Sequence, residues 1–273
     1  MSEPSVQFHR IFYQIAGREI LSDLNLEIPQ GETLVLLGRS GCGKTTTLKL
    51  VNRLLEPTSG EVRVEGKATE SWDPIRLRRR IGYVIQEVGL FPHFTVEQNI
   101  ALVPSLENWG QEAISRRVRD MLTLVGMDPE DFAHRYPSEL SGGQRQRVGV
   151  ARALAVDPPI LLMDEPFGAL DPLTRSAIQQ EFKELRDTLG KTILFVTHDI
   201  GEALELGHRI GLMVEGRLTV TLTPEELLAS TDPSVRAFIE PLRMRFARAA
   251  KEPGAQDCAP LSQASSPRVK RET

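Results

Sequence analysis

A glycine-rich loop between an apolar strand and a helix constrains the fold of this 273-residue chain more than any other feature. Residues Thr33–Leu37 form an apolar run, which predicts a strand buried on both faces of a sheet. Gly38 to Gly43 interrupt that run, and apolar residues with helical spacing follow over residues 45–55. The pattern therefore predicts a strand, a tight glycine turn and a helix in direct succession.

The loop sequence also matches the pattern G-x-x-x-x-G-K-[ST], which binds phosphate groups when it joins a strand to a helix. Its backbone N–H groups can turn inward as an anion nest, and the positive end of the helix points at the same place. Lys44 would reach the β- and γ-phosphates, and the Thr45 hydroxyl would be a ligand of Mg²⁺. The simpler alternative, a glycine turn with an incidental lysine, is disfavoured by the flanking strand and helix. The predicted phosphate-site residues are Gly38, Ser40, Gly41, Cys42, Gly43, Lys44, Thr45 and Thr46.

A second apolar strand, over residues 160–163, ends in two adjacent carboxylates, Asp164 and Glu165. Because side chains alternate along a strand, we expect the two carboxylates on different sides and in different roles. Asp164 suits a divalent cation beside a triphosphate. Glu165 suits the orientation and polarisation of a water that attacks the γ-phosphorus. Taken alone, the pair would more simply be a solvated acidic turn, but the phosphate loop upstream favours a site.

A serine and two glycines precede an apolar helix expected over residues 148–154. Ser141 is a suitable N-cap, and Gly142 and Gly143 make a tight entry turn. The same geometry can press N–H groups and the Ser141 hydroxyl onto a phosphate. Because one chain already has its phosphate loop, this second anion site indicates either an internal contact or the nucleotide of a second subunit.

Apolar strands alternate with helical stretches along most of the chain. A strand over Thr192–Thr197 is preceded by a helical stretch over residues 174–189, and residues 96–154 are largely helical in pattern. This order predicts an α/β fold with a mainly parallel sheet and crossover helices. Alternating runs at residues 24–28 and 61–65, each followed by proline or glycine, predict further strands in the first third.

Composition excludes several classes of protein. The chain has 33 Lys and Arg against 37 Asp and Glu, so its net charge of −4 argues against a nucleic-acid binder that relies on positive charge. Two cysteines, Cys42 and Cys258, exclude a disulfide framework and favour a reducing compartment. The N-terminus has no signal pattern and no run of 18 apolar residues occurs, so we expect a soluble protein. Residues 241–273 are expected to be a short, basic, partly disordered tail.

Together these motifs resemble the ATP-binding subunits of ABC transporters, over roughly residues 5–240. The most diagnostic element is Leu-Ser-Gly-Gly-Gln at residues 140–144, which includes Gln144 and distinguishes that class from other phosphate-loop enzymes. The resemblance implies a phosphate-loop ATPase core over residues 1–240, with an N-terminal antiparallel β subdomain and an inserted helical subdomain near residues 90–155.

Further residues match functional positions of the family. Gln86 matches the glutamine that touches Mg²⁺ and the attacking water, and His198 matches the histidine that contacts the γ-phosphate. Residues 168–171, Gly-Ala-Leu-Asp, match the loop that faces the opposite subunit. The adenine-stacking aromatic best matches Tyr13, with Phe12 as the alternative. The spacing that follows is about two residues longer than in the family, so packing in the core is an open alternative for either ring.

The resemblance also implies a mechanism with ATP and Mg²⁺ as cofactors. Two copies would pair head to tail, with each ATP between Lys44 and Thr45 of one copy and Ser141 of the other. Hydrolysis through Glu165 and His198 would let the dimer open. The residues implied at the metal are Thr45, Gln86 and Asp164.

The implied partners are a second copy of the chain, integral-membrane permease subunits and, indirectly, an extracytoplasmic substrate-binding protein. The permease subunits would hold the chain at the cytoplasmic face of the cell membrane, and no nucleic acid is expected.

Two stretches resemble one transporter group in particular. Residues 81–100 and 164–172 are most similar to the importers of glycine betaine, carnitine and choline, which predicts an importer subunit for quaternary-amine osmoprotectants. An ATPase subunit for another solute or for an exporter is an alternative. A non-transport ABC ATPase in DNA repair or translation is a further one, although residues 45–163 show no long coiled coil and the chain has one cassette.

Overall fold

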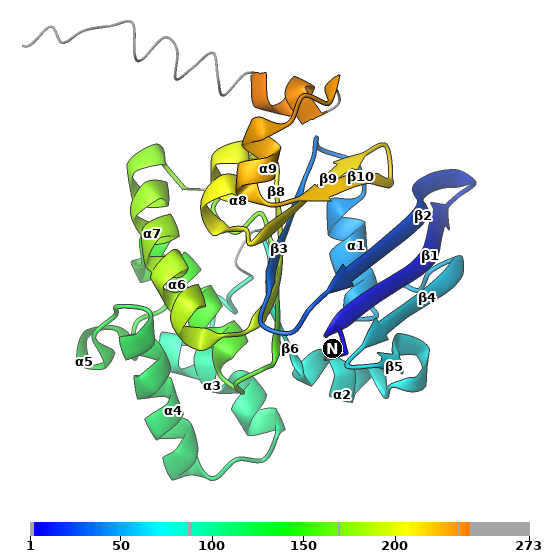
Figure 1. The fold of residues 1–273 in the computed structure, drawn as a ribbon. Helices are drawn as coiled ribbons and strands as arrows, with labels where there is room; N and C mark the ends of the chain where they lie inside the picture. Colours follow the sequence, from blue (N-terminus) through cyan, green and yellow to red (C-terminus); the bar gives the residue numbers. More distant parts are fainter. Residues whose placement is uncertain (1–2, 87–88, 169, 234, 241–273) are drawn as a thin grey trace, which may run out of the picture.

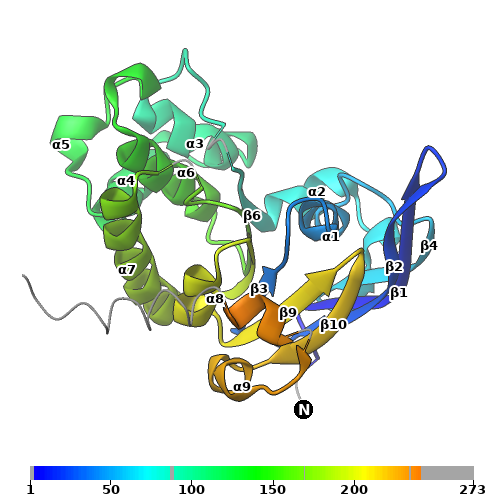
Figure 2. The same cartoon turned by 90° about the horizontal axis from the view of Figure 1, so that it is seen from above.

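A computed structural model describes residues 3–86, 89–168, 170–233 and 235–240 of the chain. They form a four-stranded sheet, a six-stranded sheet and a group of helices beside the larger sheet (Figures 1 and 2). The strands are β1 (Val6–Ile15), β2 (Arg18–Ile28), β3 (Thr33–Leu37), β4 (Ser59–Val64), β5 (Lys67–Ala68), β6 (Ile81–Val84), β7 (Ile160–Asp164), β8 (Thr192–Thr197), β9 (Arg209–Val214) and β10 (Arg217–Leu222).

The helices lie between these strands along the chain and after the last of them. They are α1 (Lys44–Val51), α2 (Pro74–Arg79), α3 (Val96–Leu106), α4 (Gln111–Leu124), α5 (Pro129–Phe132), α6 (Gly142–Leu154), α7 (Pro172–Leu189), α8 (Ile200–Leu206) and α9 (Pro224–Ala229), with 3-10 turns at Thr69–Ser71 and Pro137–Glu139. Within the described ranges, no helix combines the length and the hydropathy that crossing a bilayer requires.

The larger sheet has the strand order β10-β9-β3-β8-β7-β6, and all neighbouring strands except β10 and β9 pair in parallel. Every residue of β3, β7 and β8 is buried, as expected for strands covered by helices on both faces. The predicted mainly parallel α/β fold is therefore confirmed. Since β8 lies between β3 and β7, the carboxyl ends of all three strands meet at one edge, which is where ligands bind in such sheets.

The smaller sheet is antiparallel, with the order β2-β1-β4-β5, and it confirms the expected N-terminal antiparallel β subdomain. Strand β1 was not predicted from its own sequence pattern. Its register shifts between Phe8 and Ile11 against β2 and between His9 and Phe12 against β4, and Arg10 there has a left-handed backbone with φ 49°. This irregularity breaks the period-two alternation that would reveal a strand.

The predicted helical middle of the chain is confirmed by α3, α4, α5 and α6, which gather at one side of the molecule (Figures 1 and 2). The apolar stripe of α4 is buried at Ile114, Val118, Met121 and Leu122. Helix α3 starts at a capping box, in which Thr95 accepts from the N–H of Gln98 and Gln98 accepts from the N–H of Thr95.

The helix predicted over residues 45–55 is shorter than expected. It spans Lys44–Val51 and ends because Arg53 takes a left-handed backbone, with φ 52°. The Arg53 guanidinium donates to the carbonyl of Trp72 at 3.0 Å, which ties this turn to the segment before α2. Leu54 is 48% exposed, so its helical spacing with Leu48 and Val51 was misleading.

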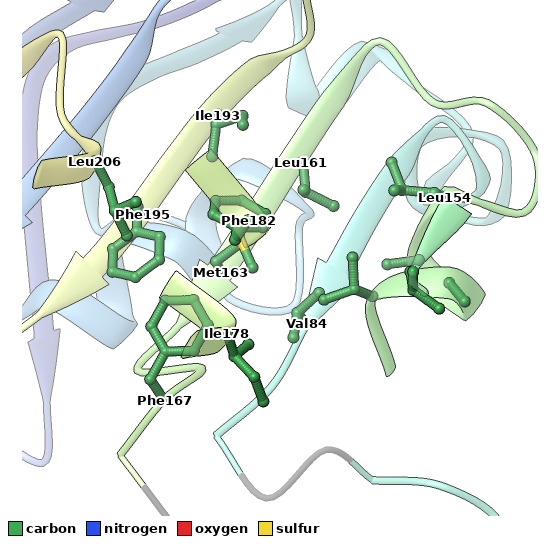
Figure 3. Close-up of a cluster of buried hydrophobic side chains, with 14 of the residues drawn as sticks. Val84, Leu154, Leu161, Met163, Phe167, Ile178, Phe182, Ile193, Phe195 and Leu206 are labelled. Carbon is green, nitrogen blue, oxygen red and sulfur yellow. The ribbon is translucent and has the colours of Figure 1, made fainter. Parts of the chain in front are cut away.

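Alternating side chains of β3 pack into two different hydrophobic clusters on the two faces of the sheet. Val35 and Leu37 join the cluster that also holds Phe167, Phe182 and Phe195 (Figure 3), whereas Leu34 and Leu36 join the other. The ring centroids of the three phenylalanines lie 5.8 to 6.4 Å apart. Burial on both faces fixes the register of β3, and with it the position of the loop that follows.

We expect Leu36→Ala to destabilise the protein by about 2–5 kcal/mol, because the truncation leaves a cavity under the central sheet. Leu36 is 0% exposed, whereas Leu173 is 86% exposed and provides a matched control. Leu173→Ala should change the free energy of unfolding by no more than about 0.5 kcal/mol in the same denaturant titration. Equal effects of the two substitutions would contradict the burial assigned to β3.

Candidate active site

The phosphate-loop sequence forms the turn between β3 and α1. Gly43 has a left-handed backbone with φ 101°, and a Cβ there would lie 2.6 Å from the side chain of Leu21 and 3.1 Å from the carbonyl of Ile20. Both the conformation and the space therefore require glycine. Gly43 also caps α1 without any side-chain hydrogen bond, so the first N–H groups of the helix have no side chain as a partner.

Lys44 lies inside this loop and is 4% exposed. Its ammonium donates to the carbonyls of Gly38 at 2.8 Å and Arg39 at 3.0 Å, so the charge is held across the loop. A cavity of about 410 Å³ opens beside it. The cavity is lined by Arg18, Ile20, Ser40, Gly41, Gly43, Lys44, Thr45, Thr46, Gln86 and Glu165. The structure thus brings most of the predicted phosphate-loop residues together with Gln86 and Glu165.

Asp164 contacts the first turn of α1. The Thr45 hydroxyl donates to Asp164 Oδ1 at 2.9 Å, although the two residues are 119 positions apart in sequence. Burial raises the pKa of the Asp164 carboxyl, the bond from Thr45 opposes this rise, and the charge of Glu165 adds to it. Burial also raises the pKa of the Tyr83 phenol, helped by the charge of Asp164 and a hydrogen bond to it.

Thr45 and Asp164 offer the oxygen atoms that Mg²⁺ prefers. Among the described residues, no group of three or more His, Cys, Asp or Glu side chains could hold a metal ion. Mg²⁺ usually takes one or two protein oxygens together with phosphate oxygens and water, and the Thr45 and Asp164 oxygens fit that pattern.

Glu165 follows the last residue of β7 and has a left-handed backbone with φ 43°. The two carboxylates do have different partners, as expected, but strand alternation is not the reason for the direction of Glu165. The left-handed turn sets that direction, and it is held by a hydrogen bond from the Glu165 N–H to the carbonyl of Val196 at 2.9 Å. Glu165 Oε2 then lies 3.0 Å from His198 Nδ1, at the end of β8.

His198 is more open than Glu165, with 60% of its side chain exposed against 18%. It lines a second cavity of about 460 Å³ together with Glu165 and the start of the phosphate loop. Ala237 and Phe238, near the end of the described chain, line the same cavity. No sequence pattern marks these two residues, because they are distant from the loop in sequence.

The Ser141 motif lies apart from this cluster. The Ser141 hydroxyl accepts from the N–H of Gln144 at 3.2 Å and so caps α6, and neither residue lines the cavity at Lys44. Packing against α7 also favours glycine at position 143, because a Cβ there would lie 2.8 Å from the side chain of Thr174 and 2.9 Å from that of Ile178. Within one chain, the two predicted anion sites are not brought together.

Tyr13 and Phe12 both lie in β1 and are half-buried. Tyr13 packs against a hydrophobic cluster and stands opposite Leu21 in β2, and it does not line the cavity at Lys44. Arg18 and Ile20 of β2 line that cavity instead, and the sequence pattern did not single them out. The adenine-stacking role of Tyr13 stays a prediction. Of the expected loop at residues 168–171, Ala169 lies outside the described residues, as do Cys258 and the tail at 241–273.

Comparison with known proteins places this arrangement in a family. The family model described as "ABC transporter" matches residues 21–168, which contain the phosphate loop, the Ser141 motif and both carboxylates. The chain belongs to the ABC transporter family. Among relatives of this ABC chain, the choline transport ATP-binding protein OpuBA of Bacillus subtilis (strain 168) is 52% identical over 82% of the chain. The glycine betaine uptake system ATP-binding protein YehX of Escherichia coli (strain K12) is 49% identical over 82% of the chain.

The chain spans 58% of the length of OpuBA, which is less than two thirds, and 72% of the length of YehX. A similar solved structure is the ATP-binding cassette MJ0796, described as a dimer in a post-hydrolysis state bound to ADP and Pi. It is 36% identical, has a TM-score of 0.71 and covers 80% of this chain, while the chain covers 98% of it. These neighbours agree with the fold described above.

We expect a maleimide to modify Cys42 slowly at neutral pH and faster as the pH rises. Burial raises the pKa of this thiol, a rise that Lys44 partly offsets, and the thiolate is the reacting form. The bulky adduct should abolish binding of a fluorescent ATP analogue, because Cys42 is 8% exposed within the phosphate loop. Mass spectrometry would follow the modification.

Cys258→Ser confines the reaction to one thiol, and Cys42→Ala provides the insensitive control, because the chain has two cysteines. Full nucleotide binding after complete modification of Cys42 would refute the assignment of the loop.

Proposed function

We propose that this chain is the ATP-hydrolysing subunit of a membrane ABC importer for quaternary-amine osmoprotectants such as glycine betaine, carnitine or choline. One observation carries the ATPase part of this proposal. Glu165 lines the cavity that holds Lys44 and Thr45, and its carboxylate lies 3.0 Å from His198. The importer part rests on the relatives, of which one is named for choline transport and another for glycine betaine uptake.

The protein side of the reaction is mainly positioning and electrostatics, as in other phosphoryl transfers. The N–H groups of the loop and the Lys44 ammonium bind the β- and γ-phosphates. Mg²⁺, held by Thr45 and Asp164 with Gln86 nearby, would neutralise charge on the phosphate oxygens. Glu165 accepts a hydrogen bond from the attacking water and so directs the oxygen of that water at the γ-phosphorus.

His198 is placed to link that carboxylate to the γ-phosphate. A ring that donates from Nδ1 to Glu165 can also donate from Nε2 to a phosphate oxygen only when it carries both protons. His198 would therefore orient Glu165 from one ring nitrogen and contact the γ-phosphate from the other.

A second copy of the chain completes each site in this proposal. The cavity at Lys44 is not lined by the Ser141 motif, which comprises Ser141, Gly142, Gly143 and Gln144. This motif would therefore bind the nucleotide held by the partner copy. The dimeric state given for MJ0796 with ADP and Pi supports this arrangement. ATP would then favour the closed dimer, because its γ-phosphate is fully bound only there, and hydrolysis would release it.

The permease subunits would dock on the helical side of the molecule and hold the chain at the cytoplasmic face of the membrane. Phe91 is 41% exposed, and its ring lies 5.3 Å from that of Phe94, which in turn lies 4.7 Å from that of His93. The buried Asn99 side chain fixes this turn by accepting from the Phe91 N–H at 2.8 Å and donating to its carbonyl at 3.2 Å. An ordered, exposed aromatic turn of this kind suits an apolar helix of a partner.

We expect Glu165→Gln to form dimers in the presence of ATP but to hydrolyse ATP at least about 100-fold more slowly, because binding survives while water activation is lost. Sedimentation with and without ATP and a phosphate-release assay measure the two effects. Glu225→Gln, an exposed substitution on α9, should match the unchanged protein. A Glu165→Gln protein that turns over at the original rate, or fails to dimerise with ATP, would contradict this role.

The substrate class can be tested by purifying the chain from solubilised membranes and assaying ATPase activity with candidate binding proteins and betaine-like ligands. Co-purifying permease subunits, together with hydrolysis stimulated by ligand-loaded binding protein, are the expected result. A permease without any response to a binding protein would favour an exporter. A soluble complex without membrane subunits, or one containing nucleic acid, would overturn the transport role.

A further inference from the structure

We propose that Glu202 is a positioning residue for hydrolysis: its buried carboxylate fixes the turn that carries His198 against helix α7, and so keeps the imidazole directed at Glu165. The inference rests on the proposed function, because it concerns the group that faces the water-activating carboxylate. It adds a residue that touches neither the phosphate loop nor the cavities beside it.

The Glu202 side chain is 5% exposed and has a hydrogen-bond donor at each oxygen. Oε1 accepts from Gln179 Nε2 on α7 at 2.9 Å, and Oε2 accepts from the hydroxyl of Thr197. Both donors are themselves buried, with 8% of Gln179 and 1% of Thr197 exposed. A carboxylate withdrawn from water is costly unless its oxygens are satisfied, so these bonds hold the two donors firmly in place.

Thr197 transmits this constraint to both neighbours of the histidine. It is the last residue of β8, directly before His198, and its hydroxyl oxygen also accepts from the N–H of Asp199 at 2.9 Å. Asp199 caps α8 by accepting from the N–H of Gly201 at 2.7 Å. The backbone on each side of His198 is therefore fixed through one hydroxyl, and the Glu202 carboxylate orients that hydroxyl.

The same group of contacts reaches the beginning of α7. Arg175 donates to the carbonyl of Leu170 at 3.1 Å, and its guanidinium lies 4.0 Å from the carboxylate of Asp199. Helix α7 itself starts at Asp171, whose side chain accepts from the N–H of Thr174. The His198 turn is thus tied to the helix that begins where the chain is expected to face its second copy.

Burial raises the pKa of the Glu202 carboxyl, and the bond from Thr197 opposes this rise. The nearby charges act in both directions, since Asp199 raises that pKa and Arg175 lowers it. Burying a carboxylate here costs more desolvation free energy than burying an apolar side chain of similar size would. The two hydrogen bonds that the carboxylate accepts offset part of that cost.

The test compares three substitutions in the ATPase. Glu202→Leu removes both acceptors, and we expect kcat to fall about tenfold or more while the Kd of a fluorescent ATP analogue changes less than about twofold. Thr197→Val removes a single hydroxyl at nearly constant volume and should reproduce most of the loss. Glu202→Gln should restore turnover to within about threefold, because its amide oxygen can still accept from Thr197 and its amide can pair with a turned Gln179. Glu205→Gln, exposed on the same helix, is the matched control.

Two further measurements separate positioning from a purely structural role. The chain has five histidines, so ¹⁵N-histidine NMR spectra can be assigned with His198→Ala. Glu202→Leu should move the ring resonances of His198 and leave the other histidines in place. In single-turnover assays on the His198→Ala background, Glu202→Leu should have little further effect, because its role is exerted through that ring.

The inference is wrong if Glu202→Leu slows turnover equally with and without His198, or if the nucleotide Kd rises as much as kcat falls. If Glu202→Leu does not fold, Thr197→Val decides, and normal turnover with unmoved His198 resonances refutes the proposal. The unchanged protein is assayed in parallel. If the unchanged protein hydrolyses no ATP, the proposed function is refuted, and this outcome is distinct from failure of the Glu202 inference alone.

Discussion

The parallel pairing of β3, β8 and β7 is the constraint on which the rest of this structure depends. In that register Leu37 pairs with Thr197, and Asp164 pairs with Val196, so the three strands end level with one another. The glycine loop, the two carboxylates and the histidine each follow one of these ends. Burial on both faces holds the register, because a slip of one residue would exchange the apolar sets that face the two clusters.

Local backbone conformations at these strand ends then direct the side chains into the candidate site. Glu165 leaves β7 in a left-handed conformation that costs free energy in a residue other than glycine, and surrounding contacts must maintain it. Phe167, two residues further on and fully buried, packs its ring 5.8 Å from that of Phe195 on β8 (Figure 3). This ring contact, together with the Glu165 N–H bond to Val196, anchors both sides of the turn.

Buried and partly buried polar groups at this edge form two layers. In the first, Lys44, Thr45 and Glu165 line the cavity and Asp164 accepts a hydrogen bond from Thr45. The second layer comprises Glu202, Thr197 and Gln179, in which Glu202 accepts a hydrogen bond from each of the other two side chains. In the proposed mechanism the first layer takes part in the chemistry and the second orients His198, which follows the end of β8 and contacts Glu165.

The sequence by itself determined the strand–loop–helix around the phosphate loop and the parallel α/β class, and it singled out Asp164, Glu165 and the Ser141 motif as candidate site residues. These features are local, because an anion nest or a strand ending in a carboxylate is made by contiguous residues whose pattern is visible without the fold. Strand β1 was missed because its irregular register hides its alternation. Helix α1 was extended beyond Arg53, whose left-handed backbone and side-chain bond to the Trp72 carbonyl have no signal in the local pattern.

Only the tertiary structure decided which of these groups meet. Thr45 bonds to Asp164 across 119 positions, and His198 contacts Glu165 across 33. Arg18 and Ile20 line the cavity at Lys44, while Tyr13 and Ser141 do not. Such contacts follow from strand order and register, which arise from the packing of the whole sheet and leave no periodic signal in the residues that they bring together.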